Sequence, residues 1–433
     1  MAGLYLFFLM LILAWMFLKV LWKPSLIFEY PHFIASVFLV FIVPQAFSLL
    51  QFPGSVSEDA VADVMLMCCL CMAAGIVGYS LSPSLKVLRR LAVEVDPGRI
   101  FHVGLVFIAT SYFFTYLLAT TEQQFTEASG LTGRATIYLF FAGLVFPGFA
   151  ICLLLFLQQP TLFRLLATLV GGIIPLIHVL GARREPAVML GLTVVLGLYY
   201  ARRKVPSRLL IFGSLAFVML AIPATGTYRG LVLYNGEIGA LKQLDLWGNF
   251  KDYFSRESVL ELRNGAALIE STKRFSRYDY GAGYWNQIVF RFVPAQFVGM
   301  DRKNALMIGT TVEKMNMDRT ENGYEISTGS TLTGMGDSFK HFGWFGCLFF
   351  LVLGLFFRSL WLASLLPNAM FAQLLYILVC TSGMRAVTHQ TTDFLPGLIY
   401  QIVFLTLGIV YAGKRKPRVQ PRRPGSVRPL PQR

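Results

Sequence analysis

Long apolar runs separated by short polar connections make up most of the chain. Backbone polar groups cannot remain unpaired in lipid, and unbroken runs of about 20 apolar residues favour helices over the strands of a barrel. We therefore predict an all-α polytopic membrane protein with about 11 transmembrane helices. The predicted helices cover residues 4–22, 32–50, 61–81, 100–120, 136–157, 162–180, 187–201, 209–225, 342–361, 367–383 and 394–412.

One long polar segment, residues 226–340, interrupts this pattern. It holds 13 of the 23 acidic residues of the chain, and 14 basic residues nearly balance them. The mixture of charge and aromatic residues indicates a folded, helical loop domain. Inside it we predict an amphipathic surface helix at 251–274, a short apolar helix at 284–292 stopped by Pro294, and a loop at 299–336. The chain thus divides into residues 1–225, 226–340, 341–413 and a basic, disordered tail at 414–433.

The net charge of +15 on a chain that is 55% hydrophobic comes mainly from short connections and the tail. Lys and Arg of these connections fall on one side of the predicted membrane, which should be cytoplasmic. The polar segment and the N-terminus are then periplasmic, and the C-terminus is cytoplasmic. This distribution is typical of membrane orientation, so we predict no nucleic-acid partner. The six cysteines lie in apolar runs, and no His–carboxylate cluster has ligand spacing, so we predict no metal and no cofactor.

Two arginines are exceptions to the concentration of basic residues on the cytoplasmic side, because Arg183 and Arg184 lie in a connection predicted to be external. Guanidinium groups bind phosphate oxygens in a bidentate fork. Pro186 is a favoured first residue of the next helix, and the unpaired backbone N–H groups at that helix start would reinforce anion binding. Binding to lipid headgroups is the alternative. Arg229 is a second phosphate candidate or a headgroup anchor. Arg291 lies in an otherwise apolar helix, where it binds an anion or pairs with a loop carboxylate.

Two groups of residues are candidates for proton transfer. Asp337 and His341 are four residues apart, which places them on one face if the next helix begins early; His341 is alternatively an interfacial residue. Arg385, His389 and Asp393 have the same spacing in the connection between the last two helices. They align only if that connection is helical.

Three local patterns together resemble the O-antigen polymerase family, the Wzy-type oligosaccharide repeat-unit polymerases of bacterial inner membranes. They are GARRE at 181–185 with a following apolar helix that ends in RRK at 202–204, YWNQIVFRFVP at 284–294 continuing to DRK at 301–303, and TLTGMGDSFKHFGWFG at 331–346. The layout, with one large external loop in the second half, is also similar to that family over nearly the whole chain. The basic residues Lys273, Arg274 and Arg277 have no counterpart in it.

The resemblance implies a glycosyltransferase with a helical, metal-independent GT-C-like fold. Such an enzyme moves a growing glycan from undecaprenyl pyrophosphate onto another lipid-linked repeat unit at the periplasmic face, and a chain-length regulator is a candidate partner. The same superfamily contains the O-antigen ligases, which use a lipid A core acceptor. A ligase and a transporter or flippase for lipid-linked sugars therefore remain alternatives.

Overall fold

The structure of the protein is a computed structural model. It describes residues 1–122, 124–125, 131–234, 244–255, 260–311, 320–321, 324–326 and 330–413. The predicted tail at 414–433 lies outside these residues. The first part of the chain forms α1 (Ala2–Trp22), η1 (Pro24–Phe28), α2 (Tyr30–Val37), η2 (Phe38–Ile42), α3 (Val43–Gln51), α4 (Glu58–Ser80), α5 (Leu85–Leu91), α6 (Pro97–Thr120), α7 (Arg134–Ala142), α8 (Val145–Gln158), α9 (Leu162–Leu180), α10 (Arg184–Arg202) and α11 (Arg208–Tyr228).

The polar segment and the last part of the chain are also helical. Two antiparallel pairs of two-residue strands are the exception, β1 (Gln124–Phe125) with β2 (Leu131–Thr132) and β3 (Thr320–Glu321) with β4 (Tyr324–Glu325). The remaining helices are η3 (Arg229–Tyr234), α12 (Leu246–Ser255), α13 (Glu261–Phe275), α14 (Ala282–Phe292), α15 (Ala295–Val298), α16 (Met300–Ala305), α18 (Thr333–Phe342), η5 (Gly343–Gly346), α19 (Cys347–Ser364), α20 (Met370–Thr388), η6 (Thr391–Asp393) and α21 (Phe394–Ala412).

Ten helical stretches in the described part of the chain are long and apolar enough to cross a membrane. The structure therefore agrees with an all-α polytopic membrane protein, and ten of the about eleven predicted transmembrane helices meet this condition of length and apolarity. The exception is α10, which forms a helix of 19 residues but carries Arg184, Glu185 and Arg202 at its ends. These charges make it less apolar than its neighbours.

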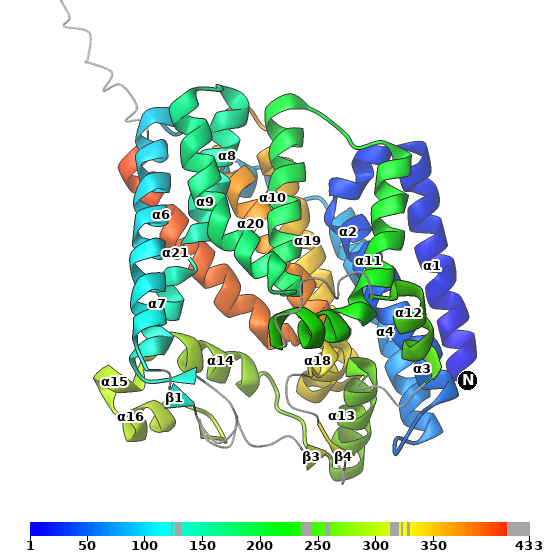
Figure 1. Cartoon of the computed structure of the whole chain (residues 1–433). Coiled ribbons are helices and arrows are strands. Elements are labelled where there is room, and N and C mark those ends of the chain that lie inside the picture. Colours follow the sequence, from blue (N-terminus) through cyan, green and yellow to red (C-terminus); the bar gives the residue numbers. More distant parts are fainter. Residues whose placement is uncertain are drawn as a thin grey trace, which may run out of the picture.

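The two ends of the bundle differ in what they carry. Figure 1 shows the N-terminus at the same end as α13, α14 and α18 of the polar segment, while α21 finishes at the opposite end. There Val95 forms a bridge with Gly413, close to the start of α6. The N-terminus and the polar segment thus share one side of the bundle.

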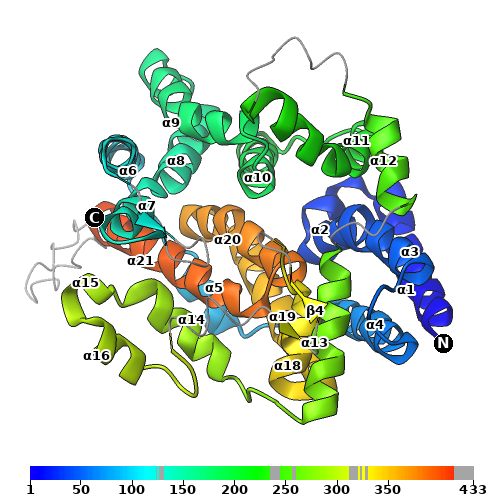
Figure 2. The same ribbon diagram turned by 60° about the horizontal axis from the view of Figure 1, so that its bottom comes forward.

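Helix α20 is the centre of the bundle. In Figure 2 it lies among α8, α10, α19 and α21. Within its apolar stretch, 83% of the residues are buried inside the protein. Its last turn reaches the end of the bundle at which the polar segment lies. Side chains there are consequently held by a helix that is packed on all sides.

Helices α4 and α19 approach each other closely because glycines face the partner backbone. A Cβ atom on Gly78 would overlap the carbonyl oxygen of Leu351, and one on Gly354 would overlap the carbonyl oxygen of Gly75. Small residues are what allow membrane helices to pack at this distance.

We expect Gly78→Leu to separate α4 from α19 and to destabilise the protein by about 1–3 kcal/mol, the typical cost of overpacking. The matched control is Gly213→Leu in α11, where an added Cβ would have none of the described atoms within 4 Å. Thermal unfolding in detergent measures both. Equal melting temperatures for the two variants would contradict the close packing.

Two predictions about the polar segment are wrong. The single surface helix expected at 251–274 is replaced by α12, which ends at Ser255, and α13, which begins at Glu261. Most of α13 is buried, because Gly265 faces Gly336 of α18 and brings the two backbones together. The loop expected at 299–336 contains α16 and the first turn of α18, while its residues 312–319, 322–323 and 327–329 lie outside the described residues. The short helix before Pro294 is confirmed as α14.

Candidate functional site

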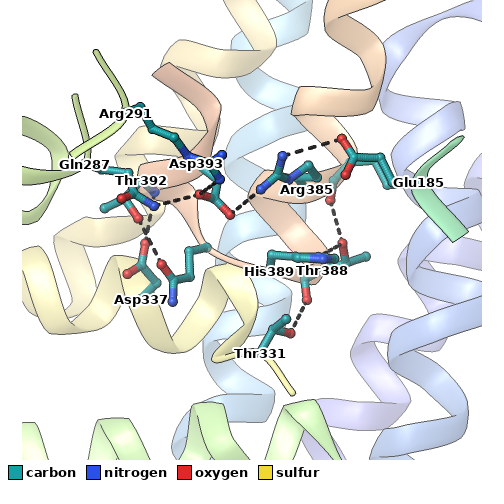
Figure 3. A network of polar contacts seen from close by, with 12 residues as sticks. Glu185, Gln287, Arg291, Thr331, Asp337, Arg385, Thr388, His389, Thr392 and Asp393 are labelled. Carbon is teal, nitrogen blue, oxygen red and sulfur yellow. Dashed lines mark hydrogen bonds and ion pairs between the residues drawn. The ribbon is translucent and has the colours of Figure 1, made fainter. Parts of the chain in front are cut away.

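An arginine in the last turn of α20 is paired with two carboxylates. Nη2 of Arg385 lies 2.9 Å from Oδ2 of Asp393, and Nη1 lies 3.5 Å from Oε1 of Glu185. The three residues come from α20, η6 and the first turn of α10 (Figure 3). Residues 200 positions apart in sequence are thereby joined by one guanidinium group.

Helix α14 of the polar segment adds two contacts to the same carboxylate. Nε2 of Gln287 donates to Oδ1 of Asp393 at 2.8 Å, and Nη2 of Arg291 lies 4.0 Å from that oxygen. The Asp393 side chain is only 10% exposed, whereas the Arg291 side chain is 48% exposed. Asp393 therefore lies between two guanidinium groups, and Arg291 keeps a surface open to a further anion.

Three of the arginines predicted to bind phosphate surround one turn. Arg183 is the N-cap of α10 and is exposed, and Nη2 of Arg229 donates to the carbonyl of Ala182 at 2.7 Å. Nη1 of Arg184 lies 3.8 Å from Glu261 at the start of α13. Burial raises the pKa of Glu261, and the positive charge of Arg184 offsets part of this rise. The helix begins two residues before Pro186, so Pro186 is not its first residue.

His389 follows the last residue of α20 and is half-buried. Its backbone N–H donates to the carbonyl of Arg385 at 2.8 Å, and its Nδ1 lies 2.9 Å from Oγ1 of Thr388. Burial lowers the pKa of His389 below its usual value of 6.5, and the charge of Arg385 lowers it further. The imidazole is therefore neutral at pH 7 and able to accept a proton.

Asp337 and His341 share one face of α18, as their spacing predicts. Oδ1 of Asp337 lies 3.6 Å from Nε2 of His341, and the two residues are 5% and 1% exposed. A Cβ on Gly283 would lie 2.5 Å from the His341 ring, so the glycine makes room for it. The pair is enclosed by protein, and neither ring nitrogen of His341 has a hydrogen-bond partner among the described residues.

The Asp337 carboxylate holds the connection that carries Asp393. The hydroxyl of Thr391 donates to Oδ2 of Asp337, and the backbone N–H of Thr392 donates to the same oxygen at 3.2 Å. Thr391 also contacts the hydroxyl of Tyr284 in α14 at 2.7 Å. Asp337 thus fixes η6, and η6 places Asp393 between the two arginines.

All nine candidate residues lie at the end of the bundle where the polar segment packs, but in different surroundings. Arg183, Arg184, Arg229 and Arg291 are partly or largely exposed, whereas Asp337 and His341 are buried. Reasoning from sequence missed Gln287, Thr391, Thr392 and Glu261 as members of the site. The i, i+4 spacing of Gln287 and Arg291 on a short helix was the available signal.

Among the residues that the structure describes, no group of three or more His, Cys, Asp or Glu side chains is placed to hold a metal ion. In comparisons with known proteins, no family model, curated protein or solved structure matches the chain. The geometry of the site is consequently the basis for a functional proposal.

Proposed function

We propose that the protein is a membrane glycosyltransferase of GT-C-like architecture that polymerises oligosaccharide repeat units linked to undecaprenyl pyrophosphate. The observation that carries this proposal is the gathering of Arg385, Arg291 and Arg184 with their carboxylates at one end of the bundle. That end also carries the polar segment, which we assign to the periplasmic side of a bacterial inner membrane. In that orientation, a lipid-linked substrate would present its pyrophosphate at this end of the bundle and its sugars beyond it.

The leaving group of such a reaction is a pyrophosphate, and arginine is suited to it. Its guanidinium remains charged and presents a planar fork of donors to phosphate oxygens. Arg183, Arg184, Arg229 and Arg291 offer these donors at the surface, while Arg385 is held by Asp393 and Glu185. A bound pyrophosphate would compete with these carboxylates for Arg385.

The transfer needs a base for the acceptor. The acceptor hydroxyl oxygen attacks the anomeric carbon of the donor glycan, the bond from that carbon to the pyrophosphate oxygen breaks, and a base takes the hydroxyl proton. His389 is neutral, half-buried and next to Arg385 at the end of α20, which favours it for this role. The buried pair Asp337 and His341 supports the connection that follows.

We expect the rate of polymerisation to fall as the pH drops through the lowered pKa of His389, which lies below 6.5, because protonation removes the base. Above that pKa the rate should be flat near neutrality. His389→Gln should be slow at every pH and should lack this acid limb. Product formation measured between mildly acidic and neutral pH tests this.

Thermal unfolding over the same pH range is the control for the His389 prediction. A histidine with a depressed pKa in the folded state also loses stability on acidification through that pKa. Loss of activity at a pH where the melting temperature, although lowered, remains well above the assay temperature would support the role of His389 as base. An identical acid limb in His389→Gln would contradict it.

Deletion of the gene separates the proposed polymerase from its rivals. Accumulation of single lipid-linked repeat units on the external face is the result that the proposal predicts. Accumulation of long polymer that is not attached to its final acceptor would instead indicate a ligase. Substrate retained at the cytoplasmic face would indicate a flippase.

A further inference from the structure

The opposite end of the bundle contains an open hollow of about 310 Å³. It is lined by residues of the second half of α1 and of η1. Figure 1 shows that α1 ends on the side of the bundle away from the polar segment. The lining of the hollow combines two indole rings, two ammonium groups and two leucines. The lining residues are Trp15, Leu18, Lys19, Trp22, Lys23 and Leu26.

The cations of this hollow have no carboxylate partner among the described residues. Nζ of Lys19 lies 3.3 Å from the centroid of the Trp15 ring. Glu29, the next carboxylate along the chain, lies 3.8 Å from Arg358 of α19 and is thus already paired. The positive charge of Lys19 and Lys23 is therefore available to an anion from outside the protein.

A third cation reaches this region from α11. Nε of Arg208 donates to the carbonyl of Leu21 at 2.7 Å, next to Trp22 of the hollow. Along α11 itself only Ile211 and Ala224 are buried, so this helix has few contacts that hold it to the bundle. An anion shared between α1 and Arg208 would strengthen its attachment.

An apolar stripe leads away from the hollow along α1. Leu11, Trp15, Leu18 and Trp22 recur at helical spacing and are 51%, 47%, 56% and 87% exposed. Lys and Trp at the end of a membrane-spanning helix lie at the level of lipid headgroups. A ligand that fits both parts carries an anionic group at the interface and an apolar chain directed toward the middle of the bilayer.

We propose that this hollow binds one anionic phospholipid. Its phosphate contacts Lys19 and Lys23, and its acyl chains lie along Trp15 and Leu18. The lipid ties α1 to the start of α11 and stabilises the bundle at this end. The inference does not depend on the proposed glycosyltransferase activity.

The test uses the full chain in nanodiscs with phosphatidylglycerol or phosphatidylcholine brominated on the acyl chains. Brominated lipid quenches tryptophan fluorescence. The quenching measured in the Trp15→Phe/Trp22→Phe variant is subtracted from that of the unchanged protein, and the difference reports lipid at the hollow. We expect quenching at a lower mole fraction of phosphatidylglycerol than of phosphatidylcholine. Lys19→Gln/Lys23→Gln should raise the mole fraction of phosphatidylglycerol required by about tenfold or more, since each interfacial cation contributes about 1 kcal/mol.

The matched control is Arg89→Gln/Arg90→Gln in α5, which removes the same charge from exposed positions outside the hollow. It should leave the quenching curve within about twofold of the unchanged protein. Equal shifts in the two double variants would overturn the proposal, because they would show only a general surface charge. Should the lysine variant fail to fold, competition on the unchanged protein decides. Unbrominated phosphatidylglycerol should relieve quenching where phosphatidylcholine does not, and equal relief by both lipids would overturn the proposal.

Discussion

Replacing Arg385 by alanine is expected to abolish polymer formation and to destabilise the folded protein. Without its guanidinium, a transition state that develops charge on pyrophosphate loses a preorganised donor, which costs about 10²–10³-fold in rate. The carboxylate of Asp393 is 10% exposed and would lose its contact at 2.9 Å. Breaking such a pair from one side costs about 3 kcal/mol, and Gln287 limits this loss through its hydrogen bond to Asp393. Polymer length on gels and thermal unfolding measure the two effects.

Two further variants separate activity from stability. Arg385→Ala/Asp393→Asn removes both charges, so it should recover most of the stability while remaining inactive. Arg358→Ala breaks the ion pair with Glu29 at the other end of the bundle, where the two groups are 3.8 Å apart. It should lose stability but retain polymer formation in the protein that folds. Normal polymer length in Arg385→Ala would contradict the assignment of Arg385 to stabilising the pyrophosphate.

Asp337→Ala is expected to lower stability by about 2–3 kcal/mol and to stop polymer formation, because two buried donors in η6 lose their acceptor. These donors are the hydroxyl of Thr391 and the backbone N–H of Thr392. Asp337→Asn keeps an oxygen at the same place and should retain activity within about tenfold, since a neutral hydrogen bond costs little relative to a missing one.

The comparison of the two Asp337 variants distinguishes positioning from proton transfer. If the carboxylate itself carried the proton, asparagine would be as inactive as alanine although its stability would be higher. Equal activities for the two variants, both near zero, would therefore contradict the positioning role. Melting temperatures and polymer yield from the same preparations provide the data.

Most of the membrane-spanning pattern could be predicted from the sequence because hydrophobic length is a local property. The burial of α13 could not be predicted in this way. Its Arg263 and Glu270 suggested a solvated face, but the structure gives both of them, and also Asn264, a partner in another element. Arg263 donates to the carbonyl of Phe52 at 2.6 Å, Asn264 donates to the carbonyl of Thr331 at 2.8 Å, and Glu270 accepts from the N–H of Ser57 at 3.3 Å. A local pattern shows polarity but does not show which polar groups find distant partners.

Part of the candidate site was predicted from the sequence, but its residues meet in the structure for a reason other than their spacing along the chain. The equal spacing of Arg385, His389 and Asp393 would have aligned them only if the connection between the last two helices were helical. In the structure α20 ends at Thr388, and Asp393 meets Arg385 because the chain turns back through η6. The contact with Glu185 depends on α10 packing beside α20, and that tertiary arrangement has no signal in the sequence of either helix.

Reconstitution tests the central claim most directly. The purified protein in lipid vesicles is supplied with repeat units linked to undecaprenyl pyrophosphate, and the products are separated by length. We predict a ladder that grows by one repeat unit per step, with release of undecaprenyl pyrophosphate, and no ladder with Arg385→Ala/Asp393→Asn. Repeat units that remain unchanged in the presence of the folded, unmodified protein would contradict the account.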